Sequence, residues 1–173
     1  EVRTHRGDGG RCSPNPEKVR PMTLYKVRLA SSALEDAHVV DRLRYGWDYL
    51  EQAISLWHLV DPVRANALVE LVERVSDAHE GPICFAGDDL VTLAHMTAGI
   101  EDAIRVTGII DRHGRVAPER LAELKRLVPA MDLETERTLE DKTNALLEVI
   151  GNAEGLHEFL SEALRDGCVV VNN

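Results

Sequence analysis

The sequence predicts a mainly α-helical protein, with a single domain at residues 22–173 in which about six helices pack around a buried central helix at 87–110. Apolar residues recur at spacings of three and four over most of the chain. Aromatic residues make up only 4% of it, so Leu, Val, Ile and Ala must supply the core. That composition favours helices packed on helices over a β-sandwich. Strand patterns occur chiefly near the two ends, at 22–29 and 168–171.

Residues 1–21 are predicted to form a flexible, mildly basic extension. They carry five Lys or Arg, three Asp or Glu and almost no apolar side chains, so they cannot bury enough surface to offset the entropy of ordering. Met22 opens the first segment with a structured pattern. We therefore expect that 1–21 is not part of the native chain; the alternative is a basic tail that docks on the acidic body or on a partner.

The first structured elements are a strand and a helix. Polar and apolar residues alternate over 22–29, as in a half-buried strand. Ser32 and Glu35 have the spacing of a capping box, which predicts a helix from about Ala33 to Arg44.

The next two helices meet at Asp61-Pro62, a helix N-cap followed by proline at the first helical position. The second of them ends at Gly81-Pro82, and a short strand or buried connection follows at 83–85. The first carries a seam spaced by three and four residues, which is internal or a dimer contact: Leu43, Trp47, Leu50, Ile54 and Trp57.

Residues 87–110 are apolar on nearly every side in their first half, which is typical of a buried helix. Glu101, Asp102 and Arg105 interrupt the segment and exclude a membrane span. The one titratable group in the apolar run after Asp89 is His95, which we expect to be a core residue with a hydrogen-bond partner.

The C-terminal half continues with a turn at 111–114 and three helices, at 118–131, 132–150 and 152–166. The apolar run 168–171 then predicts a strand. Its expected partner is the strand at 22–29, since an unpaired apolar strand end would promote aggregation.

The formal net charge of −10 disfavours binding to nucleic acid or to anionic membranes and favours a basic protein partner. The three cysteines are far apart and form no Cys-x-x-Cys pair, so a structural zinc site of the usual spacing is excluded. Their odd number and spacing are typical of a reduced, cytoplasmic protein.

Two Glu-x-x-His elements, Glu35 with His38 and Glu154 with His157, match the ligand pattern of di-iron carboxylate bundles. Residues three apart share a helix face, so each pair can reach one ion of iron, manganese or zinc. Both pairs fall in the first turn of their predicted helices, whereas bundle metals lie in the middle of the core.

Two further binding sites are open. Gly99 leaves room beside His95 for a small molecule. Tyr45 and Tyr49 are offset from the tryptophan seam, so with Asp48 they can form an exposed, amphipathic, negative surface suited to a basic partner.

No nucleophile elbow and no glycine-rich phosphate loop is present. The sequence therefore predicts a non-catalytic interaction protein, such as a small inhibitor, immunity-type protein or adaptor that binds a basic protein. The alternatives are a metal-binding helical bundle or metalloenzyme that uses the two Glu-x-x-His elements, and a small-molecule-binding bundle.

Overall fold

The computed structural model describes residues 23–30, 37–78, 81–128 and 138–172, and in this part the chain is mainly helical with a four-stranded antiparallel sheet. The predicted fold class is confirmed in that form. The elements in chain order are β1 (Leu24–Leu29), β2 (Ala37–Leu43), α1 (Gly46–Val60), α2 (Pro62–Asp77), β3 (Ile83–Phe85), α3 (Gly87–Thr97), α4 (Ile100–Val106), the 3₁₀ turn η2 (Pro118–Arg120), α5 (Leu121–Leu127), α6 (Leu139–Arg165) and β4 (Val169–Asn172).

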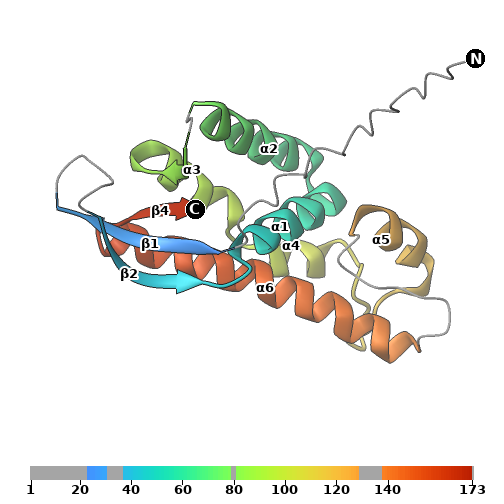
Figure 1. Cartoon of the computed structure of the whole chain (residues 1–173). Coiled ribbons are helices and arrows are strands. Elements are labelled where there is room, and N and C mark those ends of the chain that lie inside the picture. The colour runs from blue at the N-terminus through green and yellow to red at the C-terminus, as the bar shows by residue number, and fades with distance from the viewer. Residues whose placement is uncertain (1–22, 31–36, 79–80, 129–137, 173) are drawn as a thin grey trace, which may run out of the picture.

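Helix α6 is the element against which the others pack. It has 27 residues and contacts α1, α3 and β4, and α1 and α3 lie above it in Figure 1. Thr138 and Asp141 form a reciprocal capping box at its start. The prediction of two helices, at 132–150 and 152–166, is wrong from Leu139 onward, because Gly151 continues the helix; residues 132–137 lie outside the described part.

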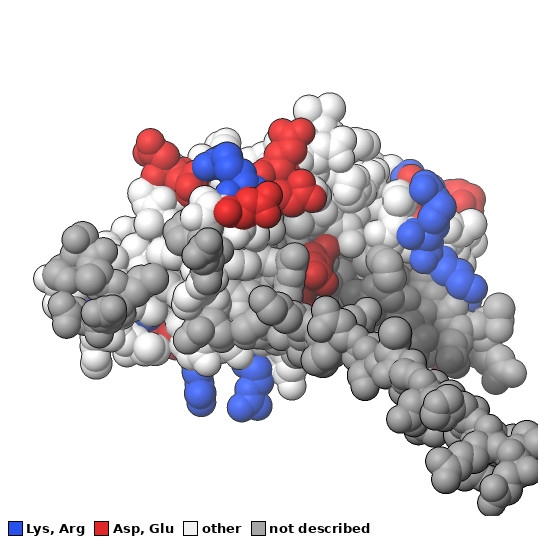
Figure 2. All heavy atoms as spheres, turned by 45° about the horizontal axis from the view of Figure 1, so that its top comes forward, with Lys and Arg blue, Asp and Glu red and all other residues white. Residues whose placement is uncertain are grey.

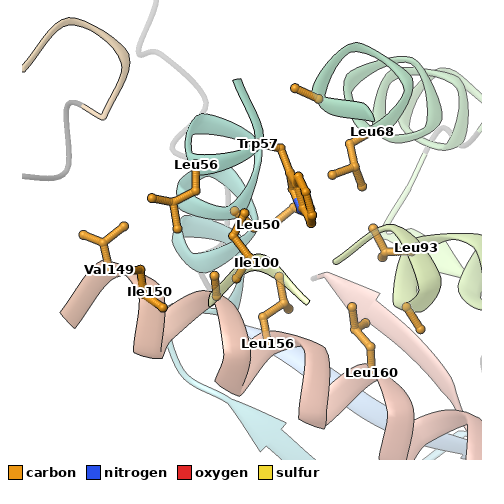
Figure 3. Close-up of a cluster of buried hydrophobic side chains, with 14 of the residues drawn as sticks. Leu50, Leu56, Trp57, Leu68, Leu93, Ile100, Val149, Ile150, Leu156 and Leu160 are labelled. Carbon is orange, nitrogen blue, oxygen red and sulfur yellow. The ribbon is translucent and has the colours of Figure 1, made fainter. Parts of the chain in front are cut away.

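The core lies between α6 and the helices above it. Apolar side chains of α1, α2, α3 and α4 converge on one face of α6 (Figure 3). Burying each large aliphatic side chain contributes about 1.5–3 kcal/mol relative to exposure. Both tryptophans of the predicted seam belong to this core, since Trp47 and Trp57 are 4% and 3% exposed.

The predicted central helix at 87–110 is wrong as a single buried helix. It breaks at Ala98–Gly99 into α3 and α4, and Gly99 has a φ of 76°, in the left-handed region that glycine adopts without steric penalty. Val91 is 52% exposed, so α3 has a solvent face as well as a buried one. A bundle of six helices around this segment is therefore not confirmed.

The predicted pairing of the terminal strands is confirmed. β1 and β4 are antiparallel, with Tyr25 opposite Val171 and Val27 opposite Val169. β3 pairs with the other side of β4, and β2 with the other side of β1, which gives the order β2-β1-β4-β3.

The helix predicted from Ala33 to Arg44 is wrong where the structure describes it. Residues 37–43 form strand β2, while 31–36, which include the predicted capping box, lie outside the described part. The adjacent valines Val39 and Val40 favour extended backbone, and pairing with β1 outweighs the local helix signal. The ladder shifts register between Lys26 and Val27, and Val40 is the extra residue of the resulting β-bulge.

Several local signals are confirmed. Asp61 caps α2 by accepting a hydrogen bond from the Arg64 amide at 3.1 Å. Asp111 accepts bonds from the amides of His113 and Arg115, as its predicted turn requires. No helix within the described ranges is long and apolar enough to cross a membrane.

Candidate functional site

The two predicted Glu-x-x-His elements lie in different kinds of structure. His38 is exposed on strand β2, so its predicted helix is absent, and Glu35 lies outside the described residues. Glu154 and His157 are on α6, well inside the helix instead of in its first turn. Among the residues that the structure describes, no three His, Cys, Asp or Glu side chains converge on a metal-sized site. Binding of iron, manganese or zinc stays a prediction.

Glu154 and His157 both bind the junction between α3 and α4. The Nδ1 of His157 lies 3.0 Å from the carbonyl oxygen of Ala94, to which it donates, in the last turns of α3. Glu154 Oε1 accepts a hydrogen bond from the Glu101 amide at 3.2 Å, in the first turn of α4. These contacts supply hydrogen-bond partners for backbone groups at two helix ends. The three-residue spacing of Glu154 and His157 therefore lets α6 bind the end of α3 and the start of α4.

Arg64 holds the same junction from the side of α2. Its Nε donates to Met96 O at 2.9 Å, and its Nη2 donates to His95 O at 2.7 Å and to Ala98 O at 3.1 Å. The guanidinium also stacks on Trp57, 3.8 Å from the ring centroid. Burial lowers the pKa of Arg64, although the nearby Asp61 acts in the opposite direction.

His95 is exposed, so the prediction of a buried core histidine is wrong. It lies on the solvent face of α3, and its described contact is the backbone carbonyl that Arg64 binds. Gly99 is exposed beside it. A pocket is found on α6, where Asp141, Asn144, Ala145 and Glu148 line it, and it includes neither His95 nor Gly99.

A buried lysine that the sequence analysis did not single out joins the sheet to α6. The side chain of Lys26 is 5% exposed, and its Nζ lies 3.3 Å from both Glu162 and Asp166 and 3.8 Å from Asp41. It also lies 5.9 Å from the centroid of the Phe159 ring. The alternation over 22–29 puts the side chains of Lys26 and Tyr25 on opposite faces of the strand, but nothing in the sequence links Lys26 to acids about 140 residues away.

Strand β2 is the most exposed element of the sheet. Every residue from Ala37 to Leu43 is exposed or half-exposed, and Val39 and Val40 are 51% and 42% exposed. Within the described ranges β2 pairs only with β1, which leaves its other edge open. The free edge of a strand presents unpaired backbone N–H and C=O groups.

Tyr45 lies two residues after the end of β2, at the N-cap of α1, and is 46% exposed. It is the one non-glycine residue with positive φ in the described part of the chain, at 61°. Asp48 and Tyr49 are half-buried, and Tyr49 packs against the core. The three predicted binding residues are therefore not equally exposed, and the most exposed of them, Tyr45, follows the end of β2 by two residues. We call Ala37–Leu43 together with Tyr45 the β2 edge surface.

Acidic side chains are unevenly distributed. On the face shown in Figure 2 they gather around basic side chains at one place, and other Lys and Arg side chains project elsewhere. Arg74 and Asp89 form such a pair at 2.7 Å between α2 and α3, and the hydrogen bond to Asp89 raises the pKa of Arg74. The exposed acids of these two helices include Glu70, Glu73, Asp77 and Asp88.

Comparison of the chain with protein-family models, with curated proteins and with solved structures finds no match.

Proposed function

We propose that this protein acts by binding another protein, and that the β2 edge surface is where the partner docks. The partner would add an extended segment to β2 as a further strand of the sheet, a mode in which backbone hydrogen bonds supply affinity and side chains supply specificity. The observation that carries the proposal is a seven-residue strand edge with which no described strand pairs, together with two exposed, adjacent valines.

The other edge strand of the sheet, β3, is less suited to pairing with a partner than β2 is. β3 has only three residues, with Pro82 before it and α3 starting two residues after it. Short edge strands and prolines are features that protect sheet edges from pairing. β2 is longer and contains neither proline nor lysine. The protections that it does carry are its bulge at Val40 and the charged side chains of Asp41 and Arg42.

The backbone of Tyr45 gives further support. A β-carbon makes the left-handed conformation unfavourable by about 1–2 kcal/mol, and glycine or asparagine usually occupies such positions. Strain of this kind concentrates at functional sites. A tyrosine here places a large, exposed amphipathic side chain two residues after the end of β2, and Tyr is among the residues enriched at binding hot spots.

Site-specific photo-cross-linking in cells tests the docking surface. A benzophenone amino acid in place of Val39 is expected to cross-link to one partner protein, and the product is expected to disappear when Val40→Lys is added. The matched controls are the same probe in place of Val106, which is 87% exposed on α4, and Val106→Lys. Equal cross-linking from both positions, or none from position 39, would overturn the proposal.

The basic partner predicted from the net charge concerns a different surface, the acidic side chains of α2 and α3. That prediction is independent of the β2 edge surface. The same cross-linking experiment with the probe in place of Val91, which is 52% exposed on α3, tests it.

A further inference from the structure

Among the residues that the structure describes, the charges at the C-terminal end of the β2 edge surface differ in sign from the charge of the whole chain. Arg42 and Arg44 are exposed at its C-terminal end, and Arg28 is exposed on β1 opposite His38. None of these three arginines pairs with an acid among the residues that the structure describes. By contrast, Arg74, Arg105 and Arg165 each lie within 4 Å of a carboxylate.

The one acid of the strand is already engaged. Asp41 Oδ2 lies 3.8 Å from the Lys26 ammonium, and its Oδ1 accepts a hydrogen bond from the Arg42 amide at 2.8 Å. Its charge is therefore partly compensated from beneath the sheet. The arginines remain as the charged groups with which a docked strand would make contact.

Electrostatic screening by salt determines whether a docked strand responds to the nearby charges or to the net charge of the whole chain. At physiological ionic strength the Debye length is about 8 Å, so exposed charges farther away contribute little. The net charge of −10 is spread over the whole chain, whereas Arg42 and Arg44 belong to the docking strand and the turn after it. The local positive charge therefore governs which strand fits.

The register shows where an acid would be placed. Val39 lies opposite Val27, and Arg42 lies opposite Tyr25. Val27 and Tyr25 are two apart on one strand and share a face. Because the bulge at Val40 absorbs one residue, Val39 and Arg42 are neighbours on that same face.

On these grounds, which rest on the proposed function, we infer that the β2 edge surface takes an extended acidic segment of a partner protein. The segment carries an apolar and an acidic residue two positions apart on one face, opposite Val39 and Arg42. A second copy of this chain fits less well, because antiparallel pairing of two β2 strands over Ala37–Leu43 places His38 of one copy, and no acid, opposite Arg42 of the other. The opposite-charge pair that stabilises neighbouring strands is then missing.

Binding of two matched synthetic peptides tests the inference. One carries valine and glutamate two positions apart with threonine elsewhere, and the other has lysine in place of glutamate. We expect the full-length protein to bind the glutamate peptide about three- to tenfold more tightly, as exposed ion pairs allow, with a preference that declines as salt is added. In Arg42→Glu the preference is expected to reverse, while Arg112→Glu, at an exposed turn arginine, keeps it.

The outcomes separate this inference from the proposed function. Equal binding of the two peptides, or a preference for lysine, overturns the acidic partner but leaves docking at β2 intact. Binding of neither peptide also overturns it, and cross-linking from position 39 then decides separately on the docking surface. Sedimentation that shows a dimer which Val40→Lys dissociates identifies a second copy as the occupant and overturns the inference.

Discussion

Lys26 shows how one buried charge joins distant parts of the chain. Burial lowers the pKa of Lys26, but hydrogen bonds from its ammonium to Asp166 and Glu162, and their negative charges, raise the pKa by more. Its pKa in the folded protein therefore lies above the ordinary 10.5. A raised lysine pKa contributes stability that is fully present below the unfolded pKa and is lost as pH rises through the folded one.

Lys26→Met is expected to lower the free energy of unfolding by about 1–3 kcal/mol at neutral pH. This is less than for a fully buried pair, because the side chains of Glu162 and Asp166 are 35% and 33% exposed. The difference from the unmodified protein should shrink as pH rises past 10.5. Urea unfolding across that range measures it, with Lys125→Met, at an exposed position on α5, as the control. A difference that does not change with pH would contradict the ion-pair account.

Tyr45→Asn tests whether the tyrosine is kept for binding at the expense of stability. Asparagine tolerates positive φ and is favoured at helix N-caps, and Tyr45 occupies the N-cap of α1 without a side-chain cap. We expect the substitution to raise the free energy of unfolding by about 0.5–1 kcal/mol and to weaken binding of the glutamate peptide. Calorimetry and peptide titration measure the two effects. Unchanged peptide affinity would remove Tyr45 from the docking surface.

At the scale of elements, two glycines of opposite role test the break between α3 and α4. A β-carbon added at either glycine would have no neighbouring atom within 4 Å, so steric clashes do not account for a difference between the two variants. Gly99 has φ of 76°, and Gly99→Ala should cost about 1–2 kcal/mol. Gly151 lies within α6, where Gly151→Ala should stabilise by about 0.5–1 kcal/mol. Urea unfolding of both variants should give changes of opposite sign, and a stabilising Gly99→Ala would contradict the break.

The sequence predicted those elements whose signals are local. The cap at Asp61-Pro62, the turn at Asp111 and the apolar strands at the two ends depend on neighbouring residues, and all form where expected. The terminal pairing followed from the need to cover an apolar strand.

Elements whose form depends on tertiary contacts were not predictable from those signals. Residues 37–43 are extended because β1 lies beside them. The predicted helices ran through Gly99 and were separated at Gly151, and the structure shows the reverse. α3 ends before Gly99, whereas α6 passes through Gly151 with buried residues on both sides, Ile150 and Ala153. Apolar periodicity does not reveal how much of a helix its neighbours cover, so α3 was predicted to be buried and His95 with it.

The candidate site was predictable only in part. Tyr45 was identified from its residue type and its offset from the tryptophan seam. The unpaired edge of β2 was not predicted, because the capping-box spacing indicated a helix over 33–44. The adjacent β-branched residues Val39 and Val40 were the sequence signal for that edge.

At the scale of the whole molecule, charge and shape favour different partners at different surfaces. The total charge of −10 favours a basic partner, whereas the open strand and its arginines favour an acidic segment. Short-range groups determine which segment fits, because the more distant charges are screened. One protein can therefore carry both surfaces without conflict.

Residue-resolved amide hydrogen exchange, with and without the glutamate peptide, tests the central claim most directly. If a partner strand pairs with β2, amides within Ala37–Leu43 that face away from β1 become protected in the complex, because they gain backbone partners. Amides of α2 and α3 should exchange at unchanged rates. Protection confined to α2 and α3, or none on β2 in the saturated complex, would contradict docking at the β2 edge surface.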